Sequence, residues 1–571
     1  MSSASFVRMK LGTRLLGLGL LSTAAACTGS DVVDEPGTDS LEVRGEAPKL
    51  CAAVRGNGHY IVTHFASLAR IVEHYGVVDG IAGGSSGSLS AFIYESIRKN
   101  PAAAQCGGAP CSPEELAPRV SLLLKSLEGY GQTVAASDEG IAIANLVGVA
   151  ARLRQEVEAR GLESLTQTDV ALAAVKLREI LAIPEVRGLV NPEVLAMLQD
   201  TEHLELNVRE IYTSIATLGA FSVDDNRLFF RTGILSWDAL GLLFGRVADF
   251  YAGYTPANPE ATSAWLDACA GAAVGKPWNE AAALPFTAPD GTASTCGAAF
   301  GKLASDYRSA ARSTNAIPKR LTERVGDASP VRKLISTSVL EGDAVGAYEA
   351  SLAAYRSGAH PTGNIPMSVS FDDVKFGYWG AQRDTDAVLA SAARATDLKT
   401  KKATSLGNAT WREILKASPA EPGLSRFVGL PDGRLSAGGW SDLAPTIVLE
   451  SMGCEKIVYV TREGDESQFA TKIAKHLGMG EADWKALYDL GDPSSSYNAA
   501  LQAADAVWCT DWNAFGDLQQ AEMAAASWSA PLETRPSFRG VRALAPYANT
   551  TPRTGKVGCT PGVSGGAQYP R

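Results

Sequence analysis

The sequence has no excess of positive charge, few histidines and, beyond its first residues, no long hydrophobic run. Its 571 residues include 52 Lys or Arg against 62 Asp or Glu, so the formal net charge is −10. Such a chain is a poor general binder of nucleic acid, because neutralising phosphates requires a cationic face. We expect no transmembrane helix after the N-terminal segment. The six histidines are not spaced with cysteine pairs as zinc ligands are, and we expect no metal and no cofactor.

Bulk disorder and fibrous structure are also excluded by composition. Charged residues make up 20% and hydrophobic residues 46% of the chain, so a large core can be buried. The 56 glycines have no three-residue period, which rules out a collagen-like helix. The length predicts one large domain with insertions, or two to three smaller domains.

The N-terminus has the pattern of an export signal. Arg8, Lys10 and Arg14 precede an apolar stretch over residues 15–26 that is too short to span a bilayer. The small residues directly before Cys27 resemble the lipobox of bacterial lipoproteins. This resemblance implies that Cys27 becomes the lipidated first residue of the mature chain; ordinary secretion with cleavage at the same place is the alternative.

An exported lipoprotein would be held at a membrane of the bacterial cell envelope by its lipid anchor, with the cell surface as one location. Residues 28–47 are mostly polar and predict a flexible tether. Eight cysteines remain after Cys27, and an even number in an exported chain favours disulfides. Cys106 with Cys111, and Cys269 with Cys296, are the local pairs that we expect.

The first folded segment has the pattern of an α/β protein. Buried strands are predicted at 51–54 and 77–82, and helices at 60–75 and 86–97. This order of strand, loop, helix, strand, turn and helix predicts the start of a parallel sheet.

The rest of the chain divides by composition. A helix start at Ser112, with Glu115 reaching back, opens a stretch that we expect to be a mostly helical insertion. Strands are predicted again near 366–371, at 455–461 and at 505–510. The predicted divisions are a signal peptide at 1–27, a tether at 28–47, a first half-domain at 48–111, the insertion at 112–364, a second half-domain at 365–530 and an irregular tail at 531–571.

Two glycine-rich turns carry the candidate chemistry. Residues 83–87 match G-x-S-x-G, which places Ser85 on a sharp turn between a strand and a helix, as a nucleophile requires. Gly56, Asn57 and Gly58 follow the first strand, where converging backbone N–H groups could form an oxyanion hole. A plain glycine turn is the alternative for this second motif.

The order of these motifs resembles that of the patatin-like phospholipase family of lipid acyl hydrolases. Residues 416–423 resemble the family's A-S-x-A-x-P-G turn, and 432–435 resemble the hairpin before its catalytic aspartate. Residues 438–445, Gly-Gly-Trp-Ser-Asp-Leu-Ala-Pro, resemble its D-G-G segment with the downstream proline. The resemblance covers 48–100 and 365–465.

This resemblance implies a three-layer α/β fold with a mostly parallel central sheet and a large helical insertion. It also implies hydrolysis of lipid acyl esters, as by a phospholipase A, through a dyad of serine and aspartate without histidine. Ser85 would be the nucleophile. Ala437 stands where the family has its aspartate, so another carboxylate must take the proton. We favour Asp442 over Asp432, because an Asp-Gly pair at 432–433 is a strong turn signal.

Ala437 also supports a second hypothesis, a catalytically inactive lipid-binding or interaction lipoprotein with this fold. A third is an unrelated surface protein whose motif matches are accidental, which the ordered matches in the second half-domain disfavour. The expected partners are an acyl-ester substrate and a membrane, with no nucleic acid; the sequence predicts no oligomeric state.

Overall fold

The protein is seen here in a computed structural model, which describes the folded body in separate ranges. The described residues are 48–56, 61–135, 171, 174–175, 178–179, 182, 187, 190, 192–203, 207, 227–230, 236–253, 259–314, 329–356, 365–370, 373–391, 403–420, 427–436, 438, 442, 445–462, 504–510 and 566–568.

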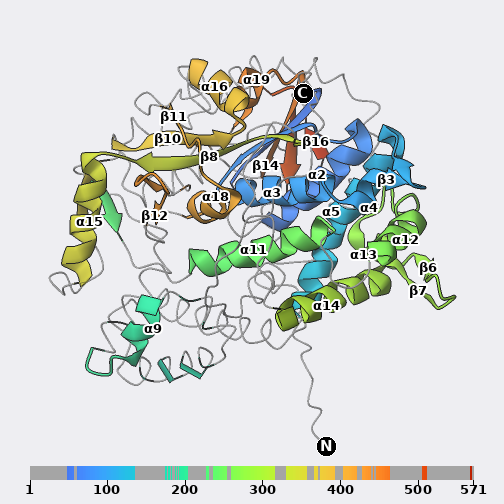
Figure 1. Cartoon of the computed structure of the whole chain (residues 1–571), viewed down its shortest axis with the longest axis horizontal. Coiled ribbons are helices and arrows are strands. Elements are labelled where there is room, and N and C mark those ends of the chain that lie inside the picture. Colours follow the sequence, from blue (N-terminus) through green and yellow to red (C-terminus); the bar gives the residue numbers. More distant parts are fainter. Residues whose placement is uncertain are drawn as a thin grey trace, which may run out of the picture.

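A mostly parallel sheet lies at the centre of the molecule (Figure 1). Its main path runs β11-β10-β8-β2-β1-β14-β15-β16, and β12 and β13 pair beside β8. The strands are β1 (Leu50–Val54), β2 (Gly80–Gly84), β8 (Arg332–Leu340), β10 (Lys375–Gly380), β11 (Ala403–Ser405), β12 (Val428–Gly429), β13 (Leu435–Ser436), β14 (Lys456–Arg462), β15 (Ala506–Thr510) and β16 (Gly566–Gln568). The five strands from β8 to β15 are parallel to one another, whereas β10 pairs antiparallel with β8.

Helices cover both faces of this sheet, which makes the protein a mixed α/β fold. Figure 1 shows α16 (Gln382–Ala390) and α19 (Thr446–Ser451) above it, with α2 (Ile61–Tyr75), α3 (Ser86–Arg98) and α18 (Trp411–Ala417) below. Trp411 of α18 packs against Phe92 of α3 and Trp379 of β10, with ring centroids 4.7 and 4.5 Å apart. All five residues of β1 are buried, as a strand covered on both faces requires.

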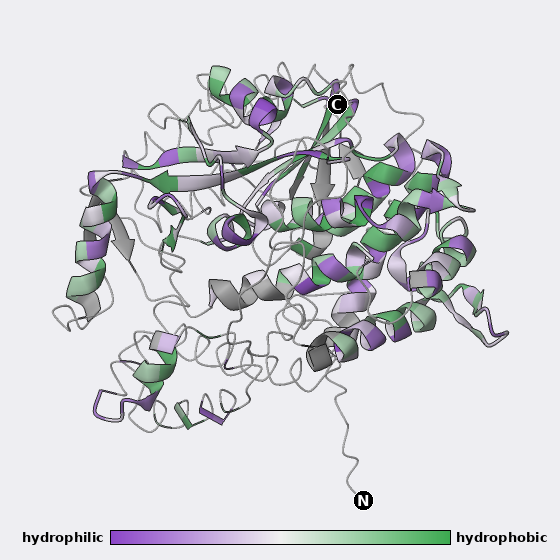
Figure 2. Ribbon diagram, in the orientation of Figure 1, coloured by the Kyte–Doolittle hydropathy of each residue, from purple (hydrophilic) through white to green (hydrophobic). Residues whose placement is uncertain are grey.

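Further helices pack outside α2 and α3, and Figure 2 shows that they carry mixed hydrophilic and hydrophobic residues. They include α4 (Pro101–Ala104), α5 (Pro113–Ala135), α11 (Trp237–Tyr251), α12 (Pro259–Cys269), α13 (Trp278–Ala282) and α14 (Cys296–Thr314). Elsewhere lie α9 (Pro192–Gln199) and α15 (Asp343–Arg356). Three separate two-stranded antiparallel sheets are β3 (Gln105–Cys106) with β4 (Ala109–Pro110), β5 (Arg227–Phe230) with β9 (Ile365–Ser370), and β6 (Pro285–Thr287) with β7 (Ala293–Thr295).

Several local predictions are confirmed. The helices at 61–75 and 86–98 and the strands at 456–462 and 506–510 lie where the sequence patterns put them. At the start of α5 the Ser112 N–H donates to Glu115 Oε2 at 2.9 Å, and the Glu115 N–H donates to Ser112 Oγ at 3.3 Å. The predicted capping box therefore forms. Part of the predicted helical insertion, residues 136–170, lies outside the described residues.

The predicted helical stretch at 112–364 contains an error. Residues 332–340 form β8, which lies in the middle of the main sheet between β2 and β10. Eight of its nine residues are buried, although the sequence Arg-Lys-Leu-Ile-Ser-Thr-Ser-Val-Leu mixes polar and apolar residues. The sequence therefore lacks both the strict apolar–polar alternation of a half-buried strand and the continuous apolar run of a fully buried one. The second strand also begins later than predicted, at Gly80, and part of the expected irregular tail pairs with β15 as β16.

Three disulfides join described cysteines. The expected pairs Cys106–Cys111 and Cys269–Cys296 are present, and each closes a short segment. A third, unexpected disulfide links Cys51 of β1 to Cys454, which precedes β14. Because these cysteines are 403 residues apart, this bond fastens the first strand to the second half of the chain. Cys559 and the predicted anchor residue Cys27 lie outside the described residues.

Among the helices that the structure describes, none is long and apolar enough to cross a membrane. The predicted signal segment and tether fall outside those helices, since the described chain begins at residue 48.

Candidate active site

The turn between β2 and α3 holds Ser85 in a strained backbone conformation. Ser85 has φ 53° and ψ −127°, and among the described non-glycine residues only Ser85 has a positive φ. Such a conformation costs on the order of 1–3 kcal/mol and persists only where the surrounding structure imposes it. The predicted sharp turn at Ser85 is therefore present, with the residue at the junction of a central strand and a helix.

The two outer glycines of the motif are required by close packing. A Cβ on Gly83 would lie 2.5 Å from the carbonyl carbon and oxygen of Gly87. A Cβ on Gly87 would lie 2.4 Å from the carbonyl oxygen of Val54 at the end of β1. Both distances are far below van der Waals contact, so no side chain fits at either position. The G-x-S-x-G pattern thus brings the first turn of α3 directly against β1.

Both backbone groups of Ser85 are held by other serines. The Ser88 hydroxyl donates to the Ser85 carbonyl oxygen at 2.6 Å, and the Ser88 N–H donates to the same oxygen at 3.0 Å. The Ser85 N–H donates to Ser418 Oγ at 3.0 Å, and the Ser418 hydroxyl donates to the Ser336 carbonyl at 2.8 Å. Ser418 follows α18 and is fully buried. The turn is therefore fastened to a segment 333 residues away.

The glycine loop after β1 reaches the same end of the sheet. Val54 pairs with Gly83, so Gly56 follows a strand whose end is level with the end of β2. The backbone N–H of Arg55 donates to the Val460 carbonyl at 3.0 Å, which holds the loop's beginning on β14. In open α/β sheets this edge, beyond the carboxyl ends of the parallel strands, is where ligands bind. Asn57 and Gly58, the other predicted oxyanion residues, lie outside the described residues.

Asp442 is attached to the strand beside β2. The Ser336 hydroxyl donates to the Asp442 carbonyl oxygen at 2.8 Å, and the Tyr378 hydroxyl donates to Asp442 Oδ2 at 3.2 Å. Ser336 pairs with Gly84, the residue before Ser85. The backbones of Asp442 and Ser85 are thus linked by a chain of hydrogen bonds. The Ser85 N–H donates to the Ser418 hydroxyl, which donates to the Ser336 carbonyl, and the Ser336 hydroxyl donates to the Asp442 carbonyl.

A close approach of two chain segments fixes the glycine before Asp442. A Cβ on Gly438 would lie 1.6 Å from the Ser418 carbonyl oxygen, so only glycine can pass there. The segment that leads to Asp442 therefore runs directly against the segment that holds the Ser85 N–H. Ala437 lies outside the described residues.

Asp432, the alternative base, lies in the turn between β12 and β13. Gly433 has φ +85°, and Arg434 donates from its backbone N–H and its guanidinium to the Asp432 carboxylate. The Arg434 side chain lowers the pKa of Asp432 below its usual value. These contacts agree with the turn role predicted for Asp432. Asp442 is the candidate whose backbone carbonyl is bonded to Ser336 in the Ser85 network and whose carboxylate accepts from Tyr378.

His64 of α2, which precedes the turn, is part of the core. His64 is fully buried, and its Nδ1 lies 2.9 Å from Ser90 Oγ. Burial lowers its pKa to about 3, so the ring is neutral at physiological pH. His59 lies outside the described residues.

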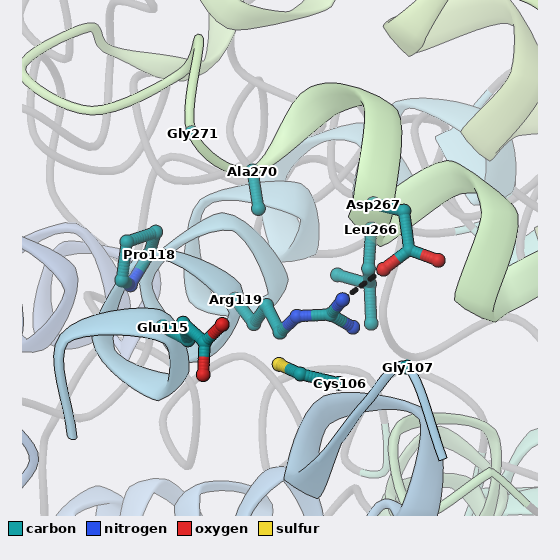
Figure 3. A pocket seen from close by; sticks show the side chains of 9 residues that line it. All are labelled: Cys106, Gly107, Glu115, Pro118, Arg119, Leu266, Asp267, Ala270 and Gly271. Atoms are coloured by element: carbon teal, nitrogen blue, oxygen red, sulfur yellow. Dashed lines mark hydrogen bonds and ion pairs between the residues drawn. The ribbon is translucent and has the colours of Figure 1, made fainter. Parts of the chain in front are cut away.

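The described residues contain a polar pocket of about 450 Å³ that shares no residue with this site. Figure 3 shows the Arg119 guanidinium in it, pointing to Asp267 of α12 and forming an ion pair. Glu115 and Cys106 lie along its other side. A lining of charged groups is poorly suited to an acyl chain. In the described part of the chain, no group of three or more His, Cys, Asp or Glu side chains could hold a metal ion.

Comparison with known proteins provides no further identification: no family model matches this chain, and no curated protein matches it.

Sequence reasoning missed Ser336 and Tyr378, which hold Asp442. No local pattern marks either residue, because each lies in a strand with ordinary β composition. Their proximity arises from the antiparallel pairing of β8 with β10, in which Tyr378 lies opposite Ser336.

Proposed function

We propose that this chain is a serine acyl hydrolase of the patatin-like type that cleaves lipid esters through Ser85. The observation that carries the proposal is the strained backbone of Ser85 at a strand–helix turn. Around that turn, Gly83 and Gly87 are required by contact distances, as in a nucleophile elbow. The resemblance of the ordered motifs to the patatin-like family supports lipid acyl esters as the substrate class.

In the proposed reaction, the Asp442 carboxylate accepts the proton of the Ser85 hydroxyl while Ser85 Oγ attacks the ester carbonyl. The tetrahedral intermediate collapses to an acyl-serine, and the leaving alcohol takes the proton back from Asp442. Water then attacks the acyl-serine with the same carboxylate as base, which releases the fatty acid and restores Ser85. General base catalysis of this kind contributes about 10²–10⁴ in rate.

The developing oxyanion needs backbone donors. The Ser85 N–H is occupied by Ser418, so this role falls to the loop at Gly56–Gly58 and to the N–H groups in the first turn of α3. The first N–H groups of a helix have no intrahelical acceptor and form the positive end of its dipole. One such donor is worth about 10²–10³ in kcat.

The alternative is a catalytically inactive lipid-binding lipoprotein, and Ala437 is the observation that favours it. A binding protein has no need of a serine in a strained turn, and Asp442, whose backbone is bonded to the Ser85 network through Ser336, supplies a carboxylate.

A fluorophosphonate probe separates the two functions. The full chain, purified in detergent, is treated with the probe, and the adduct is mapped by mass spectrometry beside the Ser85→Ala variant. We expect a label on Ser85 that is absent from the variant. A folded parent protein that stays unlabelled would reject the hydrolase and favour the inactive lipoprotein.

We further propose that a lipid on Cys27 holds the enzyme at a membrane of the bacterial envelope. Expression of the parent and of Cys27→Ser tests this point. The parent is expected in the membrane fraction with a lipid-modified N-terminal peptide, and the variant in the soluble fraction. A parent protein that is secreted without a lipid would show ordinary signal cleavage instead.

A further inference from the structure

The Asp442 carboxylate is held by a tyrosine from a different strand. Tyr378 lies on β10 and is fully buried, and its hydroxyl donates to Asp442 Oδ2 at 3.2 Å. Directly opposite on β8, Ser336 donates its hydroxyl to the Asp442 carbonyl oxygen at 2.8 Å. The backbone and the carboxylate of one residue are therefore held from paired positions on two neighbouring strands.

We propose that Tyr378 is a positioning residue of the hydrolase, which holds the Asp442 carboxylate in its charged form and in the orientation that accepts the Ser85 proton. This inference rests on the proposed function. Tyr378 acts through Asp442 and needs no contact with substrate. In this arrangement Ser85 is the nucleophile, Asp442 is the base, and Tyr378 is the third group, which orients the base.

The strand geometry explains why a tyrosine can do this. Neighbouring residues of a strand point to opposite faces of the sheet. Trp379 packs against Trp411 of α18 and against the core of that face. Tyr378 therefore points to the other face, where α19 begins a few residues after Asp442. The packed strand leaves the phenol ring little freedom, so the position of its hydroxyl is well defined.

The phenol also remains a donor over the whole working pH range. Burial, followed by the charge of Asp442 and the hydrogen bond to it, raises the pKa of Tyr378 well above its usual value. A neutral hydroxyl donating to a carboxylate favours the ionised carboxylate over the protonated acid. Removing the donor should therefore move the acid side of the pH profile to higher pH.

Several charged groups on neighbouring elements are already paired. Glu341 and Lys375 form an ion pair at one end of the β8–β10 ladder, Arg332 and Asp384 of α16 form another at its other end, and Asp432 is paired with Arg434 in the β12–β13 turn. Arg55, buried after β1, stays protonated. From β2, β8 and the end of α18 the site receives uncharged serines.

The test compares Tyr378→Phe with Tyr251→Phe in the full chain. Tyr251 is also fully buried, and its hydroxyl lies 3.1 Å from Ser126 Oγ in the outer helices, so its loss is a matched control. The rates of p-nitrophenyl butyrate hydrolysis and of fluorophosphonate labelling at Ser85 are measured from pH 4 to 9. Circular dichroism reports the fold.

We expect Tyr378→Phe to lower kcat by about tenfold with KM little changed, the loss expected when a charge-assisted hydrogen bond is removed. The acid limb of its kcat/KM profile should move up by about one pH unit. In an Asp442→Asn background the same substitution should have no further effect, since Tyr378 acts through that carboxylate. Tyr251→Phe should keep the parent profile.

An unchanged acid limb in Tyr378→Phe, or an equal loss in the Asp442→Asn background, would overturn the inference while leaving the hydrolase intact. A parent that neither turns over nor labels at Ser85 would instead reject the proposed function, and the inference with it. If Tyr378→Phe fails to fold, 3-fluorotyrosine at position 378 keeps the hydroxyl and makes it a stronger donor. The acid limb should then move to lower pH, and an unmoved limb would again reject the role of Tyr378.

Discussion

The turn around Ser85 and the outer helices differ in how their buried polar groups are satisfied. Between α2 and the helices that pack outside it, Glu73 of α2 and Lys125 of α5 form an ion pair, and each side chain is only 2% exposed. Ser121 and the Gly275 N–H also donate to the Glu73 carboxylate, while Lys125 donates to the Ala273 carbonyl. These bonds join three segments and stabilise their packing.

Around Ser85 the polar groups are serine hydroxyls that fix a strained backbone. Ser88 and Ser418 hold its carbonyl and its N–H, and the backbone carbonyl of Asp442 is attached to the same network through Ser336. Strain lowers the free energy of unfolding, so its presence in this one turn supports the proposed role of Ser85 as nucleophile. The buried ion pair between α2 and α5 therefore supports the packing of these helices, whereas the strained turn at Ser85 reduces the free energy of unfolding.

The largest expected effect comes from substituting Ser85, where the loss of hydrolysis and the relief of backbone strain can be measured separately. Ser85→Gly should reduce hydrolysis by roughly 10⁴-fold or more, because the nucleophile is lost. It should also raise the free energy of unfolding by about 1 kcal/mol, since glycine adopts positive φ without strain. Ester hydrolysis and urea unfolding measure the two effects. Ser85→Ala is the control: it should be equally inactive without the gain in stability, and an equal gain would show that Ser85 is not strained.

The next effect concerns the base. Asp442→Asn should lower kcat by about 10²–10⁴, because an amide cannot accept the proton, and should leave folding intact. The matched control is Asp432→Asn, which removes a carboxylate paired with Arg434 in an exposed turn and should retain parent activity. Turnover of parent rate in Asp442→Asn would show that Asp442 is not the base.

Between α2 and α5, removing one buried charge should affect stability alone. Glu73→Gln leaves Lys125 buried without its counter-charge and should reduce the free energy of unfolding by about 3 kcal/mol, with Ser85 labelling retained. Asp306→Asn is the comparison, because its partner Lys302 has a side chain 77% exposed and the pair should contribute less than about 1 kcal/mol. Denaturant titration would contradict the comparison if both substitutions cost the same.

The smallest effect compares two glycines within helices. Gly87→Ala should lower stability by about 1–3 kcal/mol, because the new Cβ would lie 2.4 Å from the Val54 carbonyl oxygen. Gly301→Ala in α14 meets nothing within 4 Å and should raise stability by about 0.5–1 kcal/mol. Thermal unfolding distinguishes the opposite signs. A neutral Gly87→Ala would mean that α3 does not depend on close contact with β1.

Local signals in the sequence were sufficient for individual elements. Helical periodicity predicted α2 and α3, the pair Ser112 and Glu115 predicted the start of α5, and cysteine spacing predicted two short disulfides. Each depends on residues close together in the chain, where geometry follows from periodicity, capping and loop length. The turn at Ser85 belongs here as well, since G-x-S-x-G describes the contacts that the turn must allow.

Only the tertiary structure decided what lies beside that turn. The mixed polar and apolar sequence of β8 has neither strict alternation nor a continuous apolar run, and its place between β2 and β10 follows from strand pairing across the chain. The same pairing puts Tyr378 and Ser336 on Asp442, and the disulfide from Cys51 to Cys454 joins segments that no spacing rule connects. The sequence by itself determined the candidate nucleophile and its turn. The partners of that nucleophile depend on contacts between distant segments, which no local pattern encodes.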